Sequence, residues 1–343
     1  MTLDPPPVQK RTAKIPGVFY ALADGHDLPV IDVTNPAFAL PYDEAEMARR
    51  VAIFARAERW RARIPKSIQR AVLGWAARRS RLAQAFLRAS EGAIGGMTLY
   101  AAKLGPDLLG SGYPTAIDRQ MAAAPPSWLS RVRLEDMARL LEEALGPLLV
   151  MHPARPLHLF NIAGGPAADS WNALLLLYRR APEHLGGRPI VIQVLDRDEG
   201  GPAFGARAVA ALRGEGAPLR DLDLRFRRVA YDWRDTAPLR RTLHEDGASQ
   251  AVVAVSSEGG LFEYGTDQEI VGNLETIRDA TPDDAIVVGS VTRAEGPIEF
   301  LREFTVRPRT LAAFRELAAR GGWSLARVIE RPLAYDVRLS RRA

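Results

Sequence analysis

The amino-acid sequence predicts an α/β protein: a mainly helical N-terminal domain, then a mostly parallel seven-stranded sheet with an antiparallel C-terminal strand. Two observations support the sheet. From residue 156 onward, strand-length apolar runs alternate with helical segments, a pattern typical of a parallel sheet covered on both faces. The chain then ends in two strand-like segments joined by only four residues, and so short a connection permits only an antiparallel pair.

The N-terminal domain, residues 1–150, begins with a predicted β-hairpin. Apolar runs at 18–23 and 28–33 flank Asp24-Gly25-His26-Asp27, which is turn chemistry. Helical spacing of apolar residues follows over 43–104, and a further apolar stripe predicts a helix from about Ser130 to Leu149. We expect Pro125-Pro126 to precede this helix and Gly146-Pro147 to strain its end.

The second domain, residues 151–343, contains the alternating pattern. Five apolar runs predict its parallel strands: 157–162, 189–195, 224–230, 251–256 and 285–291. Helical segments fill the gaps between these runs: 169–180, 204–213, 236–245 and 268–280. A helix over about 308–320 is followed by the two closing strands, 324–330 and 335–340.

Composition excludes several classes of protein. The 343 residues are 47% hydrophobic and 25% charged, which argues against intrinsic disorder. The absence of cysteine excludes disulfides, thiolate nucleophiles and zinc–cysteine sites. No apolar run approaches the roughly 18 residues of a membrane span, and MTLDPPPVQKRTAK lacks the apolar core of a signal peptide. We therefore expect a soluble cytoplasmic protein.

The net charge of +5 is concentrated in the N-terminal domain. Residues 45–90 contain 12 basic residues but only Glu46 and Glu58 as acidic ones. A solvated helical face is the simplest interpretation, and the absence of a binding motif beside the charge argues against nucleic acid as a partner. An acidic carrier protein delivering the substrate is the alternative.

Polar residues follow three successive strands of the predicted sheet, and ligands bind at the carboxyl ends of such strands. After the first comes Asn161-Ile162-Ala163-Gly164-Gly165-Pro166-Ala167-Ala168-Asp169, whose small residues let a ligand approach the backbone. After the second comes Asp196, which can accept hydrogen bonds from the two hydroxyls of a ribose; Asp198 competes for this role. After the third comes Asp232-Trp233, which suits an adenine ring.

With these residues, the second domain resembles the class I S-adenosylmethionine (SAM)-dependent methyltransferases. That family has a Rossmann-like seven-stranded sheet whose final antiparallel strand follows a hairpin. The resemblance implies SAM as cofactor. By the same resemblance, the residues that would bind SAM are Asn161, Ala163, Gly164, Gly165, Asp196, Asp232, Trp233 and Ser256. Asn161 stands where the family has an acidic residue, so the charge that would complement the cofactor's ammonium group is missing there.

The resemblance also places the acceptor site in Ser256-Ser257-Glu258-Gly259-Gly260, after the fourth strand. Glu258 is then a candidate base, and Tyr264 a candidate cation–π contact with the sulfonium. Alternatively, Glu258 is an ordinary surface carboxylate and Tyr264 a half-buried tyrosine without a role in catalysis. The helical N-terminal domain would act as a lid that completes the acceptor pocket.

Three functions remain open at this point. The first is a biosynthetic small-molecule methyltransferase, and the second is an enzyme that cyclises SAM to methylthioadenosine and a product such as azetidine-2-carboxylate. The third is a non-catalytic SAM-binding or scaffold protein, against which an acceptor-sized cavity would count. An NAD-dependent oxidoreductase is disfavoured because the glycine-rich loop lacks the dinucleotide pattern. The five histidines show no metal spacing, so we expect no metal, and a homo-oligomer is possible.

Overall fold

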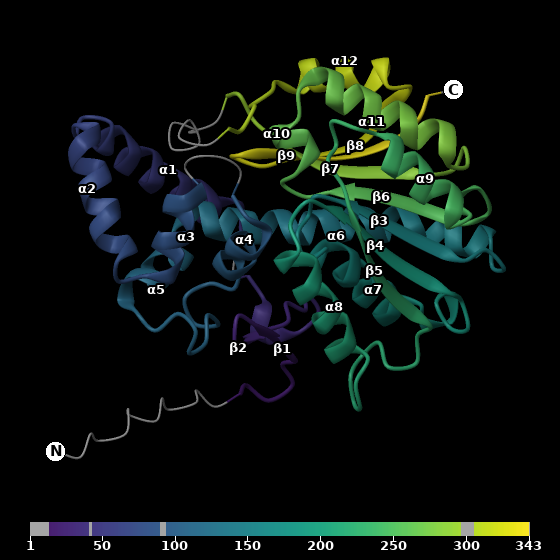
Figure 1. Cartoon of the computed structure of the whole chain (residues 1–343), viewed down its shortest axis with the longest axis horizontal. Coiled ribbons are helices and arrows are strands. Elements are labelled where there is room, and N and C mark those ends of the chain that lie inside the picture. Colours follow the sequence, from purple (N-terminus) through teal and green to yellow (C-terminus); the bar gives the residue numbers. More distant parts are fainter. Residues whose placement is uncertain (1–13, 41–42, 90–93, 296–304, 343) are drawn as a thin grey trace.

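The computed structural model describes residues 14–40, 43–89, 94–295 and 305–342, and Figure 1 shows two regions side by side. The first is a β-hairpin with helices, in purple and blue, from which the teal helix α6 extends to the sheet. Its elements are β1 (Tyr20–Ala23), β2 (His26–Pro29), α1 (Glu44–Arg61), α2 (Lys66–Ala77), α3 (Arg81–Ala89), α4 (Gly96–Lys103), α5 (Ala116–Ala123) and α6 (Pro125–Met151). Most of the N-terminal segment interpreted above lies outside the described residues.

The second region is the predicted sheet. Its strands are β3 (Leu157–Ile162), β4 (Ile190–Asp196), β5 (Leu224–Ala230), β6 (Val252–Ser257), β7 (Ile286–Thr292), β8 (Trp323–Glu330) and β9 (Ala334–Arg341). Their helices are α7 (Ala168–Arg180), α8 (Gly200–Leu212), α9 (Ala237–Glu245), α10 (Leu261–Tyr264), α11 (Asp267–Ala280) and α12 (Leu311–Arg320).

The strand order is β5-β4-β3-β6-β7-β9-β8, with β3 to β7 parallel and β9 antiparallel to both β7 and β8. This arrangement confirms the predicted fold class, including the closing hairpin that the resemblance implied. The order also reverses at β3, because β4 and β5 lie on one side of it and β6 on the other. A crevice for a ligand is expected at such a reversal.

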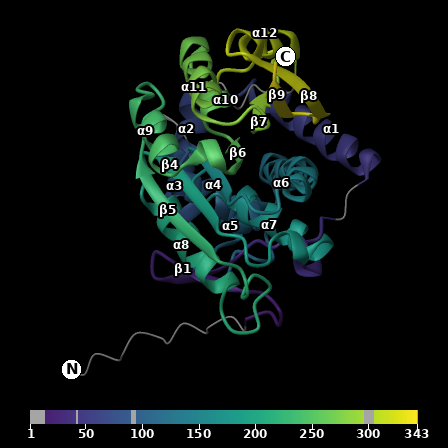
Figure 2. The ribbon, with the colours of Figure 1, turned by 90° about the vertical axis from the view of Figure 1, so that its right-hand side faces the viewer.

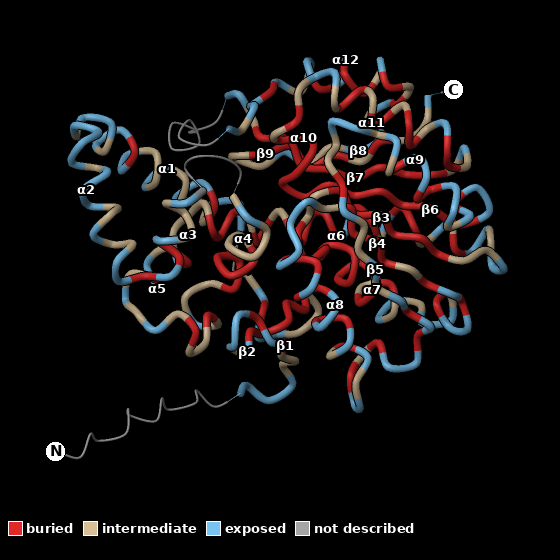
Figure 3. Tube along the Cα trace, viewed as in Figure 1, coloured by how far each residue is buried: buried red, intermediate tan, exposed pale blue. Residues whose placement is uncertain are grey.

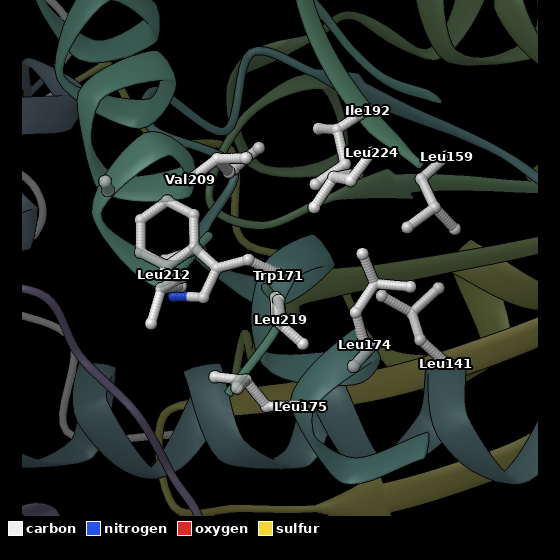
Figure 4. Packing of buried hydrophobic residues seen from close by; sticks show 14 of the residues in the cluster. Leu141, Leu159, Trp171, Leu174, Leu175, Ile192, Val209, Leu212, Leu219 and Leu224 are labelled. Carbon is white, nitrogen blue, oxygen red and sulfur yellow. The ribbon is translucent and has the colours of Figure 1, made fainter. Parts of the chain in front are cut away.

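Helices cover both faces of the sheet, as Figures 1 and 2 show. Alternate residues of each strand point to opposite faces, so each strand supplies two cores. One core joins the strands to α6, α7 and α8, and the other joins them to α9, α11 and α12. Leu159, Ile192 and Leu224 meet Trp171 and Leu174 of α7 in the first core (Figure 4). Buried residues thus concentrate in the sheet and its helices (Figure 3).

Helix α6 connects the two regions and differs from its prediction. It begins at the two prolines, Pro125 occupying the first turn where no backbone N–H needs an intrahelical partner. It also continues through Gly146-Pro147 to Met151, two residues beyond the predicted end at Leu149. Burial of Leu145 and Leu149 against the sheet stabilises the turn that Pro147 weakens.

The N-terminal hairpin is confirmed, with a tighter turn than predicted. Only Asp24 and Gly25 form the turn, both at positive φ (47° and 79°), and His26-Asp27 belong to β2. Two residues of this conformation match the twist of an antiparallel pair. The helices predicted over 43–104 appear as α1 to α4, which follow one another around the blue region of Figure 1. No helix among the described residues is long and apolar enough to span a membrane.

Candidate functional site

The loop between β3 and α7 lies at the point where the strand order reverses. Asn161 is fully buried at the end of β3, and its Nδ2 donates to Ser256 Oγ of β6 at 3.0 Å. Its Oδ1 accepts from the backbone N–H of Gly164 at 2.9 Å, which shapes the loop. Ala163, Gly165 and Ala167 all have positive φ (54°, 60° and 61°), a conformation that costs energy for the two alanines. This strained loop has the position expected for a ligand site.

Asp169, in the first turn of α7, is the residue of this loop that the sequence analysis did not single out. It is fully buried and accepts at Oδ1 from Asn161 Nδ2 (2.8 Å) and from the Ser170 backbone (2.9 Å). Its Oδ2 has no hydrogen-bond partner among the described residues. Burial, followed by the charge of Glu258, raises the pKa of Asp169 to about 6. The negative charge missing at Asn161 is therefore available eight residues further along the chain, in the first turn of α7.

Two helices cover the glycine-rich loop closely. A Cβ on Gly96, at the start of α4, would lie 2.6 Å from the Cα of Gly165, and a Cβ on Gly201 of α8 would lie 2.8 Å from the same atom. Only glycine at these positions permits such an approach. The N-terminal region therefore reaches the predicted cofactor loop through the first residue of α4.

The two predicted nucleoside carboxylates lie at the ends of β4 and β5. Asp196 accepts from the backbone N–H of Gly165 at 3.1 Å and of Asp198 at 2.9 Å, and burial raises its pKa. It thus links the glycine-rich loop to the end of β4. Asp232 is partly exposed, and its hydrogen bonds with Arg234 lower its pKa to about 2. Both groups hold local loops together while remaining at the edge where a ribose and a base would bind.

Trp233 and Ser256 are also part of this edge. Trp233 is half-buried and packs against the core beneath α9 and α11, and its carbonyl oxygen accepts from Asn273 Nδ2 at 2.8 Å. Ser256 is buried at the end of β6 beside Asn161. The structure therefore brings the loop, Asp196 and Ser256 together at neighbouring strand ends, with Asp232 and Trp233 at the end of the outer strand β5.

Glu258 lies in a buried ion-pair network. Lys103 Nζ of α4 donates to Glu258 Oε1 at 2.5 Å, and Arg133 Nε of α6 lies 3.3 Å from the same oxygen. Arg133 Nη1 also donates to Glu263 Oε1 at 2.7 Å, and Thr292 Oγ1 donates to that oxygen at 2.8 Å. The charges of Lys103 and Arg133 overcome burial and lower the pKa of Glu258. The charge of Glu258 is thus already matched by two cations. A role for Glu258 as a base remains a prediction.

Tyr264 lines a cavity of about 270 Å³ beside this network. The cavity lies between the N-terminal helices and the ends of β7 and β9, with apolar side chains from α2, α3, α4 and α6. Burial raises the pKa of Tyr264 to about 12, so the phenol is protonated at neutral pH. Its ring lies in the wall of this cavity, and a contact with a sulfonium remains a prediction.

The residues that sequence analysis missed belong to a buried charged cluster. Its members are Lys103, Arg133, Arg331, Asp136, Asp169, Glu258, Glu263 and Asp336. Lys103, Arg133 and Asp136 look like ordinary helix-surface residues in the sequence, and no motif marks them. Asp336 offered one signal, since a charged residue interrupts an apolar strand. Among the described residues no group of three or more His, Asp or Glu could hold a metal ion.

Comparison with known proteins gives partial structural likenesses. No protein family and no curated protein matches the sequence. Among solved structures, the neocarzinostatin O-methyltransferase NcsB1 with S-adenosylhomocysteine has 17% identity and a TM-score of 0.37 over 54% of this chain and 49% of its own. The pyocyanin biosynthetic protein PhzM has 15% identity and a TM-score of 0.39 over 67% and 59%. LepI with SAM has 17% identity and a TM-score of 0.38 over 59% and 46%.

The matched region spans about half the length of those solved structures. The assignment of a class I methyltransferase-like fold rests on the strand order and the closing hairpin.

Proposed function

We propose that the protein is a SAM-dependent enzyme that methylates a small molecule, with SAM bound over the carboxyl ends of β3, β4 and β5. The observation that carries the proposal is Asp169, a buried carboxylate with an unpartnered oxygen directly after the glycine-rich loop. SAM has an ammonium group and a sulfonium against one carboxylate, and is a cation overall. A buried oxygen of this kind is costly unless a ligand group satisfies it.

The charged cluster fits a cationic ligand as a whole. It contains three cations and five carboxylates, so ionisation of all eight leaves it two negative charges in excess. Asp169 would hold the cofactor's ammonium group, and Asp196 and Asp232 at the next two strand ends would hold its ribose and adenine. Those three carboxylates, with Asn161 and the closely packed backbone of the glycine-rich loop, form the binding set that we propose.

The methyl group of bound SAM is the electrophile, so the protein's task is to orient the acceptor and exclude water. Helices α4 and α6 supply both functions: Gly96 lies against the glycine-rich loop, and Leu99 and Leu129 line the cavity. This cavity lies at the ends of β7 and β9, on the acceptor side of the proposed cofactor. It argues against a protein that only binds SAM. The N-terminal region is thus proposed as the lid, with its boundary near residue 150.

A second candidate function is cyclisation of SAM, and the position of Asp169 favours it. A carboxylate with a pKa of about 6 beside the ammonium group could accept its proton. In this reaction the N–Cγ bond forms as the Cγ–S bond breaks, and the electron pair leaves on sulfur. The products are methylthioadenosine, azetidine-2-carboxylate and the proton held by Asp169.

Incubation of the purified protein with SAM alone, followed by mass spectrometry, tests both candidates. For the methyltransferase, we expect SAM to be bound and recovered intact, or S-adenosylhomocysteine to copurify. Methylthioadenosine released at a rate proportional to enzyme, together with a cyclic amino acid, would instead establish cyclisation. If SAM neither binds nor changes, both candidates are wrong.

A further inference from the structure

The cavity beside Tyr264 has an apolar body and a charged inner end. Leu73, Phe86 and Leu99, from three different N-terminal helices, line its apolar part. At the sheet, Arg133, Glu263, Arg331 and Asp336 line it instead. A ligand that fills this space therefore has an apolar portion and one polar end.

Asp336 is the charged residue at the inner end for which the described residues provide no ion pair. It lies on β9 two residues from Ala334, which also lines the cavity, and side chains two apart in a strand share a face. Tyr335 and Val337 pack into the opposite core beneath α11 and α12, so the Asp336 side chain is directed to the face that α6 covers. The residue is fully buried, and neither carboxylate oxygen has a hydrogen bond of normal geometry with the described residues. The hydroxyl of Ser290, its cross-strand neighbour on β7, is the polar group beside it and acts to lower its pKa.

The neighbouring cations are already paired with other carboxylates. Arg133 contacts Glu258 and Glu263, and Arg331 forms a two-point contact with Asp136 at 2.6 and 2.8 Å. Burial and the charge of Asp136 raise the pKa of Asp336 well above its usual range. Of the five carboxylates in the cluster, Asp336 and Asp169 are thus the two with a fully buried oxygen that lacks a hydrogen bond among the described residues. A positively charged ligand group would supply the counter-charge and the hydrogen bonds that Asp336 lacks.

We propose that this cavity binds a small amphipathic amine, with its ammonium group at Asp336 and its apolar portion among the N-terminal helices. The claim that this amine is the methyl acceptor rests on the proposed function. The claim that the cavity binds an amine does not depend on it. An uncharged alcohol of the same shape leaves the carboxylate without a counter-charge, so the site discriminates between the two.

Calorimetry with tryptamine and tryptophol, which share an indole ring and differ in amine against hydroxyl, tests the proposal. We expect the wild-type protein to bind tryptamine at least tenfold more tightly than tryptophol at pH 7.5. In Asp336→Asn the preference should disappear because the amine affinity falls, with little change for tryptophol. Asp221→Asn is the control: Asp221 is an exposed carboxylate just before β5, at the opposite edge of the sheet, and its loss should leave the preference intact.

The titrations are run both without nucleotide and with S-adenosylhomocysteine. Amine preference without any binding of S-adenosylhomocysteine supports the amine site and overturns the SAM assignment. Equal affinities for the two probes, or no binding of either at millimolar concentration, overturn the amine site whatever the nucleotide does. The wild-type comparison requires no variant, so misfolding of Asp336→Asn would not rescue the proposal.

Discussion

The two halves of the sheet's carboxyl edge hold their carboxylates in different ways. At β4 and β5, Asp196 and Asp232 are partly exposed, and Asp232 pairs with Arg234 two residues along the chain. At β6 and the β8–β9 turn, partners are distant in sequence: Glu258 is 155 residues from Lys103, and Asp136 is 195 residues from Arg331. In the β4–β5 half, the partners of the carboxylates come from the adjoining loops. In the other half, each pair has one member on α4 or α6.

This difference has an energetic consequence. Partly exposed carboxylates are screened by water, and their pairs contribute little to stability. Buried pairs have lost their hydration, so removing one partner leaves a charge that nothing compensates. Variants in the buried half should therefore affect folding strongly, and variants in the exposed half should affect ligand binding with little effect on folding.

The largest expected effect is for Lys103→Met, in the buried half. Glu258 then keeps only the longer contact with Arg133, and we expect the free energy of unfolding to fall by about 3–5 kcal/mol. Urea denaturation of the variant and the wild type measures this change in the free energy of unfolding. Lys14→Met is the control, because the Lys14–Asp27 pair is well exposed and its loss should cost at most about 0.5 kcal/mol. Equal effects of the two variants would remove the distinction between the halves.

Asp169→Asn should stabilise the protein and weaken ligand binding. The pKa of Asp169 is raised from 3.8 to about 6, so its ionised form costs stability above pH 6, and the cost disappears as pH falls towards 3.8. We expect the variant to be more stable than wild type by up to about 3 kcal/mol at pH 8, with the difference vanishing near pH 4. Urea denaturation of both proteins between pH 4 and pH 8 measures this difference in stability. A variant less stable at pH 8 would show that the charge is already compensated.

Gly96→Ala tests the contact between α4 and the glycine-rich loop. The added Cβ would lie 2.6 Å from Gly165 Cα, so one backbone has to shift, at a cost of about 1–3 kcal/mol. Gly146→Ala in α6 is the matched control, because nothing lies within 4 Å of its Cβ and helix propensity predicts a gain of about 1 kcal/mol. Thermal denaturation of both variants gives the comparison; a neutral Gly96→Ala contradicts the close approach.

The smallest effect on folding is expected for Asp232→Asn in the exposed half. Its stability should change by less than about 0.5 kcal/mol, whereas S-adenosylhomocysteine should bind about tenfold more weakly in calorimetry, about 1.4 kcal/mol. Asp221→Asn again serves as the control and should bind as wild type does. Unchanged affinity of Asp232→Asn would remove the adenine assignment, and a large loss of stability would contradict the division of the edge into two halves.

Most strands were predictable because each buried strand is a short, mainly apolar run of residues in the sequence. The runs 157–162 and 224–230 match β3 and β5, and the four-residue connection before residue 335 required the antiparallel hairpin. The persistence of α6 beyond Leu149 was not predictable in this way. Gly146-Pro147 weakens a helix locally, but packing of Leu149 against the sheet outweighs that preference.

The candidate site divides along the same line. Small residues and carboxylates directly after strands are visible in a sequence, so Asn161, Asp196 and Asp232 could be named from their positions. Asp169 stood in the same segment, yet its importance depends on its burial and on an oxygen that has no hydrogen bond of normal geometry with the described residues. Lys103 and Arg133 carry no local mark, because each meets its carboxylate from a helix more than a hundred residues away.

The sequence by itself determined the α/β alternation, the closing hairpin and the polar strand ends, since these depend on neighbours along the chain. Only the tertiary structure decided which charges are buried, which are paired, and which remain without a partner. Burial and pairing depend on what other segments place around a group, and desolvation makes those neighbours decisive for its charge. Asp169 and Asp336, whose properties carry the two proposals, acquire them only in the folded protein.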